Sequence, residues 1–546
     1  MFRGSLSPLQ AVGLLIVPVA AAIVICWSWL GTPIEMPDQP LGPSQKLYCV
    51  SYAPFRGQQT PLDKTMRVDP SQIDEDLKQL SRLTDCVRTY STDLGLDRIA
   101  EIAARYNLKV IQGLWLGREA TRNRREIETV VGIAKRFPNV LRAIVVGNEV
   151  LLRGEMSASD LANTIRTVKA QVQVPVTYAD VWEFWLRFRE AYDAVDFITI
   201  HVLPYWEDFP IPAGQAAEHV DNIRRKIAEA FPNKEILIGE VGWPSAGRMR
   251  EGALPSPANQ AQVLTDVLAL ARRENFHVNV IEAFDQPWKE QLEGTVGGHW
   301  GLLDGKTRDF KFEWGVPVSN HPDWLRQACG GIVLAGLIFG AGLAARRGRG
   351  GAGKISVPTW IGLAFMAFGP GMVVGWAIEN VPIESLGVGG WLRSLALVAL
   401  GVAAPLLAAA ALTRGVPTPG FAQVLARAGE RPADPLMMGL GLVYVLVSLM
   451  AIQVALGLVF DPRYRDFPFT PLTAAIIPFV VLTLFGPRSL GERGIAELVS
   501  AITLGGCAIY IVLNEGFDNW QGLWLAATLA ALSATLARSR DAQGLK

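Results

Sequence analysis

Long apolar runs at the start of the chain and throughout its last third limit the possible folds more than any other feature. The first covers Leu9 to Gly31. The others lie at Ala328–Ala345, Pro358–Ile378, Trp391–Leu412, Leu436–Phe460, Pro471–Phe485, Ile495–Leu513 and Trp520–Ala537. About 20 apolar residues suffice to cross a bilayer as a helix. The sequence therefore predicts a cytoplasmic start and N-terminal transmembrane anchor (1–31), a C-terminal all-α membrane domain of about seven helices (328–537) and a cytoplasmic tail (538–546).

A cleaved signal peptide is the competing explanation for the first run. Arg3 precedes the run, and Trp27 and Trp29 stand near its end, as in a membrane anchor. No small-x-small cleavage site stands before Pro33. These features favour an anchor that is retained in the mature protein.

Basic residues are distributed unequally among the segments that connect these runs. The segments on the side of the N-terminus carry Arg346, Arg347, Arg349, Lys354, Arg414, Arg427, Arg431, Arg488, Arg493, Arg538 and Arg540. Those on the opposite side carry only Arg463 and Arg465. Cytoplasmic loops are enriched in Lys and Arg, so residues 32–325 are expected on the outer face of the membrane.

Composition narrows the function classes. Only 19% of the residues are charged, against about a quarter in ordinary soluble proteins. The 51 basic residues balance the 51 acidic ones, so no nucleic-acid partner is expected. The five cysteines show no close C-x-x-C spacing, and we predict neither a metal site nor a cofactor. Ionisable residues in the apolar runs stand near the ends, which favours an anchoring or scaffolding bundle over a transporter.

The region between the first apolar run and Trp324 alternates short apolar runs with helix-like segments. The segments at 71–83 and 257–275 have helical periodicity, and a Ser cap is expected to open the first of them. The apolar runs lie at 46–54, 85–91, 108–117, 141–149, 174–180, 196–205, 234–243 and 278–288. This alternation predicts an α/β fold, a TIM (β/α)8 barrel over residues 45–325. A doubly wound open sheet is the alternative, disfavoured because no Gly-rich phosphate loop follows the first run.

Polar residues stand repeatedly where these predicted strands end. They are Arg88, Tyr90, Asn148, Glu149, His201, Tyr205, Glu240, Glu282 and Asp285. Each has a structural explanation by itself: Arg88 as a buried ion-pair partner, His201 as a core histidine, Glu149 as a helix cap. Together they describe one pocket, because the carboxyl ends of barrel strands meet at one face. Two carboxylates across such a pocket can cleave a glycosidic bond if one is protonated and the other ionised.

Aromatic residues gather at the same strand ends. They are Trp115, Trp182, Trp185, Tyr205, Trp206, Trp243, Trp288 and Trp300. Exposed tryptophans suit stacking against the apolar faces of pyranose rings. About half of them are expected to pack between barrel and helices instead.

Four segments, "VVGNEVLL", "IGEVGWPS", "EAFDQPWK" and "HWGLL", resemble glycoside hydrolase family 17, the β-1,3-glucanases. The resemblance covers residues 45–315 and implies a retaining mechanism on β-1,3-linked glucan. It makes Glu149 the general acid/base and Glu240 the nucleophile. Asn148 is expected to hydrogen-bond the sugar 2-hydroxyl, and Tyr205 to position the nucleophile.

By the same resemblance, Glu282, Asp285, Trp288 and Lys289 match the family's eighth-strand pocket. Together with other polar and aromatic residues near strand ends, the predicted substrate-binding set contains Asn148, Tyr205, Arg88, Tyr90, Tyr52, Trp115, His201, Trp243, Glu282, Asp285, Trp288 and Lys289. One departure is visible, since His201 stands in "HVLPYW" where many relatives have Asn in an N-x-Y-P-like segment.

The layout of anchor, barrel and membrane helices is similar to that of bacterial membrane proteins described as β-(1→6)-glucan synthases. The resemblance implies a bacterial inner (cell) membrane, with the catalytic domain in the periplasm or outside. The longest inward segment, 413–435, is too short for a glycosyltransferase domain. A membrane-anchored β-glucan transglycosylase is therefore the leading hypothesis, with the bilayer and a glucan synthase or export protein as partners. A β-1,3-glucanase and a non-catalytic glucan-binding scaffold are the alternatives.

Cys49 and Cys86 belong to the first two predicted strands. An oxidising compartment makes a disulfide between them conceivable. Buried free thiols are the favoured expectation, because Cys is common in strand cores.

Overall fold

The computed structural model describes residues 8–42, 44–347, 355–427, 429–487 and 494–540, and divides them into two compact units. One unit is the segment Ile34–Val318. The other combines Met1–Pro33 with Ser319–Lys546. Of the basic residues expected in inward segments, Arg349, Lys354, Arg488 and Arg493 lie outside the described residues.

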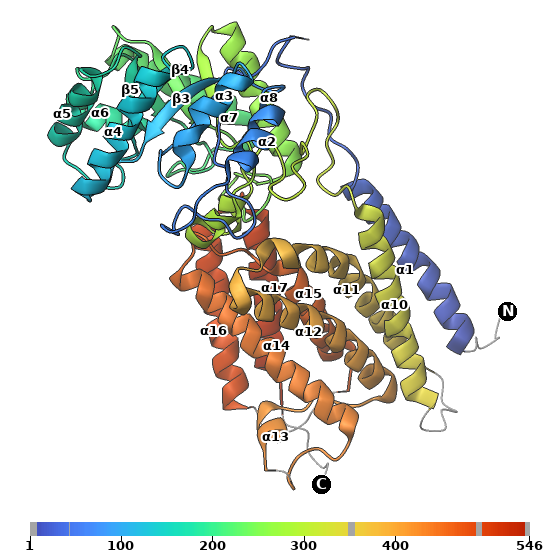
Figure 1. Cartoon of the computed structure of the whole chain (residues 1–546). Helices are drawn as coiled ribbons and strands as arrows, with labels where there is room; N and C mark the ends of the chain where they lie inside the picture. Colours follow the sequence, from blue (N-terminus) through green and yellow to red (C-terminus); the bar gives the residue numbers. More distant parts are fainter. Residues whose placement is uncertain (1–7, 43, 348–354, 428, 488–493, 541–546) are drawn as a thin grey trace. The chain divides into compact units, whose positions relative to one another are not determined.

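Eight parallel strands close into a barrel in the order β1 to β8, which confirms the predicted fold class (Figure 1). Each strand overlaps one of the apolar runs. Their bounds are β1 Cys49–Ser51, β2 Cys86–Arg88, β3 Lys109–Leu114, β4 Leu141–Asn148, β5 Val176–Val181, β6 Ile198–His201, β7 Ile236–Val241 and β8 His277–Val280.

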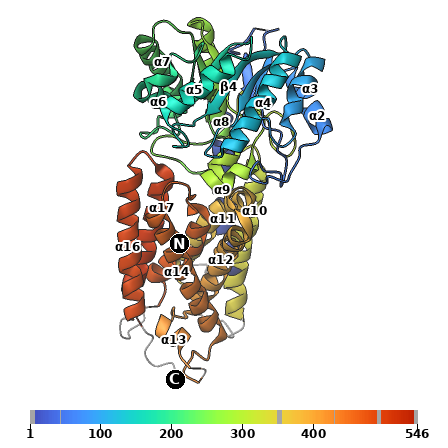
Figure 2. The same ribbon diagram turned by 60° about the vertical axis from the view of Figure 1, so that its left-hand side comes forward.

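Helices follow the strands and cover the outside of the barrel, as the turned view shows (Figure 2). They are α2 Pro70–Leu80, η1 Leu96–Arg98, α3 Ile99–Arg105, α4 Ala120–Arg136, α5 Ala158–Lys169, α6 Trp182–Arg187, η2 Arg189–Ala191, α7 Ala213–Ala230 and α8 Pro257–Arg273; after β8 come η3 Pro287–Lys289, α9 Glu290–Glu293 and η4 Thr295–Gly298. Asp69, not the expected serine, caps α2 by accepting from the backbone N–H of Ser71. Pro70 fits the first helical position, where no N–H is needed.

A small apolar cluster fills the barrel interior near the amino ends of its strands. It contains Cys49, Cys86, Ile111, Ala143, Val145, Ala179 and Leu237. Cys49 and Cys86 form a disulfide, so the expectation of free thiols is wrong. The pairing of Val50 with Val87 sets the two cysteines opposite each other, with Cα atoms 4.4 Å apart. Such a separation lies within the range that disulfides require.

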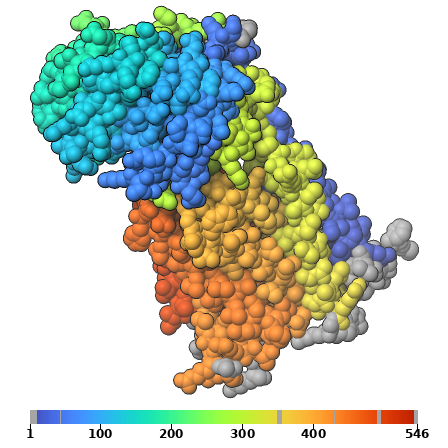
Figure 3. Space-filling model, viewed as in Figure 1, coloured from blue at the N-terminus to red at the C-terminus, as the bar shows by residue number. Residues whose placement is uncertain are grey.

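In the second unit every described secondary-structure element is a helix, and the predicted apolar helices are among them (Figure 1). Its helices are α1 Pro8–Leu30, α10 Trp324–Arg347, α11 Val357–Glu384, α12 Gly387–Arg414, α13 Phe421–Leu425, α14 Pro435–Phe460, α15 Phe469–Phe485, α16 Ile495–Glu515 and α17 Trp520–Arg538. Seven of the described helices are long and apolar enough to cross a membrane, and α15 is a shorter apolar helix. Side chains of α10 (yellow) and of α11 to α14 (gold to orange) form one continuous face of this unit (Figure 3).

The N-terminal helix α1 packs into the helical unit. Its Ile23 and Trp27 are fully buried, and the Trp27 indole donates to the carbonyl of Met372 on α11. Helices α10 and α11 approach closely at Gly331 and Gly371, where a Cβ on Gly331 would lie 2.0 Å from the Gly371 carbonyl oxygen. Small residues at such crossings let helix backbones pack tightly in membranes.

Candidate active site

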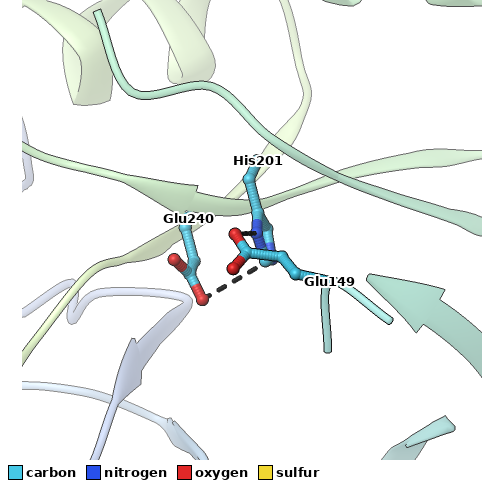
Figure 4. A group of neighbouring side chains, drawn as sticks. All are labelled: Glu149, His201 and Glu240. Carbon is cyan, nitrogen blue, oxygen red and sulfur yellow. Dashed lines mark hydrogen bonds and ion pairs between the residues drawn. The ribbon is translucent and has the colours of Figure 1, made fainter. Parts of the chain in front are cut away.

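The carboxyl ends of β2, β4, β6 and β7 bring four of the predicted residues into contact. Arg88, Asn148, His201 and Glu240 are each the last or next-to-last residue of their strand, and Glu149 follows β4 directly. One oxygen each of Glu149 and Glu240 and one His201 nitrogen all lie within 4.8 Å of one another. Figure 4 shows the imidazole beside both carboxylates.

The turn that presents Glu149 has an unusual backbone. Gly147 has a φ of +88°, and a Cβ there would lie 2.6 Å from a methyl of Val150. Glu149 itself has a φ of +53°, in the left-handed region that costs a non-glycine residue energy. Strain of this kind persists only where the surroundings enforce it, and it clusters at functional sites. The "GNE" sequence therefore specifies a turn that aims Glu149 inward.

Arg88 is the centre of the polar network and is completely buried. Its Nη1 donates to Glu240 Oε1 at 2.8 Å and to the Gly239 carbonyl at 2.9 Å. Its Nη2 donates to Asn148 Oδ1 at 2.5 Å and lies 3.3 Å from His201 Nε2. Because the guanidinium always carries its charge, it supplies a fixed positive charge among these groups.

Glu240 is held in its ionised form. Burial raises its pKa, but the charges of Arg88 and Lys289 and a hydrogen bond from Tyr90 outweigh burial and lower the pKa. The Tyr90 hydroxyl lies 2.9 Å from Glu240 Oε1. A buried carboxylate with these partners keeps its charge at neutral pH, as a nucleophile requires.

Glu149 lies in a more open position, with 23% of its side chain exposed against 7% for Glu240. Its Oε1 lies 2.8 Å from His201 Nδ1. Behind it, Arg153 donates to the Asn148 carbonyl and stacks over the Trp115 ring at 4.1 Å. The two acids therefore have different surroundings, as two different chemical roles require.

A third acidic group follows β8. Glu282 has a φ of +58°, and its carboxylate contacts the ammonium of Lys289. Burial raises the pKa of Glu282 to about 7, although Lys289 lowers it. The charge of Lys289 also lowers the pKa of Glu240, so this ammonium acts on both carboxylates.

Four predicted binding residues make other contacts. The Tyr205 hydroxyl donates to the Arg248 carbonyl, and Tyr90 contacts Glu240 where Tyr205 was expected. Tyr52 is buried and donates to Asp76 on α2. The other two are Trp243, which is 0% exposed and donates to the Leu254 carbonyl, and Asp285, which accepts from Lys311 and from the Gly301 N–H. In these positions the structure departs from the expectation, because packing and loop attachment occupy the side chains.

The aromatic residues at the strand ends include both fully buried and partly exposed rings. Trp185 and Trp300 are buried like Trp243. Trp115 and Trp288 are half-buried, and the Trp288 indole donates to Gln286. Trp115 and Trp288 therefore stay partly exposed.

Sequence reasoning missed several polar groups of this network. Asn279 on β8 donates to Ser51 Oγ and to the Gly239 carbonyl, and Ser51 contacts Tyr90. Asp180 on β5 accepts from the Val181 N–H, and burial raises its pKa to about 6. Each is a polar residue in an apolar strand or at its end. The same search for polar residues near strand ends could therefore have identified them.

Glu149, His201 and Glu240 have the spacing of a metal site. However, Glu240 Oε1 already accepts from Arg88 and Tyr90, and the Arg88 guanidinium lies against His201 Nε2. A permanent positive charge between two of the donor atoms opposes a divalent cation there. These residues fit acid–base chemistry better than metal binding.

Residues 49–301 match the family described as the BtgE/BtgC glycoside hydrolase domain. A glucan 1,3-β-glucosidase of Candida albicans is 26% identical over 257 residues, which cover 43% of this chain and 83% of that protein. A probable β-glucosidase btgE of Aspergillus flavus is 30% identical over 225 residues, or 40% of this chain and 36% of that protein.

Among solved structures, a glycoside hydrolase family 17 β-1,3-glucanosyltransferase from Rhizomucor miehei is similar, with 24% identity and a TM-score of 0.43. The match covers 49% of this chain and 100% of that one.

Proposed function

Because its barrel is a glycoside hydrolase domain of the BtgE/BtgC type, similar to family 17, we propose that this protein is a membrane-anchored retaining β-glucan transglycosylase. The donor is a β-1,3-glucan, and the acceptor is another glucan chain, which is elongated or branched through a β-1,6 bond. Glu240 is the nucleophile and Glu149 the general acid/base.

The separation of the two carboxylates carries this proposal. Their nearest oxygens lie within 4.8 Å. Retaining glycosidases place the carboxyls about 5 to 5.5 Å apart, whereas inverting enzymes need about 6.5 to 9.5 Å to admit a water. In the first step Glu240 attacks the anomeric carbon while Glu149 protonates the departing oxygen. In the second step Glu149 removes a proton from the acceptor, which displaces Glu240.

Asn148 is oriented for substrate by its bond to Arg88. Its Oδ1 accepts from the guanidinium, so its Nδ2 is left as the group that donates. A donor beside the anomeric centre suits the sugar 2-hydroxyl, whose hydrogen bonds strengthen in the transition state.

Transfer rather than hydrolysis requires that a sugar hydroxyl reach the glycosyl-enzyme before water. The half-exposed rings of Trp115 and Trp288 support an acceptor site, since they offer surface for stacking. Binding an acceptor in register raises its effective concentration far above that of a free solute. The second candidate is a β-1,3-glucanase, and the name of the Candida albicans relative favours it.

The helical unit supports a multi-pass membrane location. Seven described helices have the length and hydropathy of membrane spans. We place the protein in a bacterial inner membrane, with the barrel on the periplasmic or outer side, because basic residues concentrate in the opposite segments. The disulfide in the barrel agrees with an oxidising compartment. A glucan synthase or export protein would be the partner that supplies donor chains.

Incubation of the full-length protein in detergent with β-1,3-gluco-oligosaccharides of one length, followed by linkage analysis, tests the proposal. Transfer yields longer or branched chains together with shorter ones. Formation of shorter products alone would establish the glucanase instead. Binding without any turnover would favour the glucan-binding scaffold, provided that a Trp115→Ala variant loses retention of glucan.

A further inference from the structure

His201 occupies the position between the two proposed catalytic acids. Its Nδ1 lies 2.8 Å from Glu149 Oε1, and its Nε2 lies 3.5 Å from Glu240 Oε1 (Figure 4). The imidazole is 1% exposed. The ring is therefore shielded from bulk water. Both of its nitrogens must find their hydrogen-bond partners within the protein.

Arg88 decides which nitrogen carries the proton. The guanidinium has only donors, and its Nη2 lies 3.3 Å from His201 Nε2. Nε2 must therefore present its lone pair, and Nδ1 carries the hydrogen. Nε2 thus accepts from Arg88, and the geometry gives the tautomer that donates from Nδ1 to Glu149 Oε1.

We propose that His201 is a positioning residue that selects which oxygen of Glu149 carries the catalytic proton; this inference rests on the proposed function. Since Oε1 accepts from His201, the acid proton resides on Oε2. Within the described part of the chain, Oε2 makes no hydrogen bond. That proton passes from Oε2 to the departing glycosidic oxygen as the bond from Glu240 to the anomeric carbon forms. The proton on His201 Nδ1 stays in place throughout.

The backbone around Glu149 makes this selection possible. The Glu149 N–H donates to the Ala179 carbonyl at 2.8 Å, and the Glu149 carbonyl accepts from the Arg153 N–H at 2.9 Å. Because both backbone groups of Glu149 are hydrogen-bonded, rotation of its side chain is the main motion left to it. The His201 contact removes that freedom, so Oε2 stays aimed in one direction. Loss of the contact should therefore impair proton donation while leaving the nucleophile in place.

Two substrates separate proton donation from nucleophilic attack. A β-1,3-gluco-oligosaccharide needs an acid to protonate its leaving oxygen, whereas 2,4-dinitrophenyl β-glucoside leaves without protonation. For His201→Ala in the full-length protein, kcat/KM on the oligosaccharide should fall about tenfold or more beyond any fall on the aryl glucoside. His201→Asn should largely restore the ratio, because its amide nitrogen replaces Nδ1. His201→Gln should not, because its amide lies nearer the Nε2 position.

His219→Asn is the matched control, since His219 contacts Glu207 and none of the carboxylate pair. It should leave the ratio of the two kcat/KM values unchanged. Equal falls on both substrates for His201→Ala, or a Gln variant as good as the Asn variant, would overturn the inference. If the Ala variant does not fold, the comparison of Asn with Gln decides. Absence of turnover by the wild-type protein on every β-glucan would instead refute the proposed function itself.

Discussion

The two ends of the barrel interior are built from the same strands but carry opposite kinds of side chain. Strand β1 begins at Cys49 and ends at Ser51, and β2 begins at Cys86 and ends at Arg88. Toward the amino ends the interior is apolar and cross-linked. Toward the carboxyl ends it holds a buried arginine, a histidine and several acids. In TIM barrels the first end usually supports stability and the second catalysis.

This contrast shows where burial of charge is tolerated. Isolated buried charges are costly, and they persist when paired and hydrogen-bonded. Arg88 meets that condition by bonding to groups from two other strands, Asn148 on β4 and Glu240 on β7. Substitutions of the two proposed catalytic acids should therefore act mainly on turnover, and removal of the disulfide at the amino end should act on the free energy of unfolding.

Replacement of the nucleophile should have the largest effect. Glu240→Gln keeps the shape of the side chain but removes the negative charge that forms the glycosyl-enzyme. We expect kcat on β-1,3-gluco-oligosaccharides to fall by roughly 10³-fold or more. Glu183→Gln, a half-buried acid after β5, is a control that should retain activity. Retention of more than about a tenth of the wild-type rate by Glu240→Gln would contradict the assignment.

Replacement of the acid/base should produce a loss that depends on the substrate. Glu149→Gln should lower kcat/KM on gluco-oligosaccharides by about 10²- to 10⁴-fold. Turnover of 2,4-dinitrophenyl β-glucoside should recover when azide is added, because azide attacks the glycosyl-enzyme without a general base. The product should be the β-glucosyl azide, identified by NMR. Failure of azide to change the rate would exclude Glu149 from this role.

Removal of the disulfide tests the amino end of the barrel, where we expect a loss of stability without a loss of activity. The bridge joins residues separated by 37 positions, and in the chain-entropy model a loop of this size contributes about 4 kcal/mol. The Cys49→Ala/Cys86→Ala protein should lose about that much unfolding free energy, while its kcat/KM stays within about threefold of wild type. Denaturant unfolding of the full-length protein in detergent measures the first quantity.

Cys329→Ala is the control for that experiment, because Cys329 is a free and exposed cysteine of the helical unit. It should change neither stability nor activity. A large loss of activity without a loss of stability in the double variant would show that the apolar end also serves catalysis.

Asp180 should give the smallest effect, visible as a dependence of stability on pH. Burial raises its pKa to about 6, above its usual value of about 3.9 in an unfolded chain. The folded state thus binds the proton more tightly, and the stability this provides is complete below about pH 4 and lost as the pH rises through about 6. Wild type should lose about 3 kcal/mol between pH 4 and pH 8 relative to Asp180→Asn. Parallel pH curves for the two proteins would contradict this prediction.

Sequence reasoning reached the barrel and the gathering of polar residues at one face, because both depend on strand order. The choice of Glu149 and Glu240 as the acid pair came from the resemblance to family 17 and stays a prediction. The alternation of strands and helices fixes which residues end each strand, and strand ends meet at one face. The apolar helices followed from length and hydropathy alone.

Details that depend on rotamers and packing could not be predicted in this way. Tyr205 and Tyr90 both follow strands, yet Tyr90 contacts Glu240 whereas the Tyr205 hydroxyl donates to the Arg248 carbonyl. Trp243 follows β7, the strand that carries Glu240, yet its side chain is fully buried. Periodicity gives the strand and its end, whereas neighbours from other strands decide where each side chain points. The disulfide likewise depended on the register of β1 against β2, which a single sequence does not specify.

The central claim is that Glu240 forms a covalent bond with the sugar while Glu149 handles the proton. Incubation with a 2-deoxy-2-fluoro-β-glucosyl donor bearing a good leaving group, followed by proteolysis and mass spectrometry, tests it directly. The account predicts a stable fluoroglycosyl ester on the peptide that contains Glu240. A label on Glu149 or Glu282, or turnover of the donor with inversion and no labelled peptide, would contradict it.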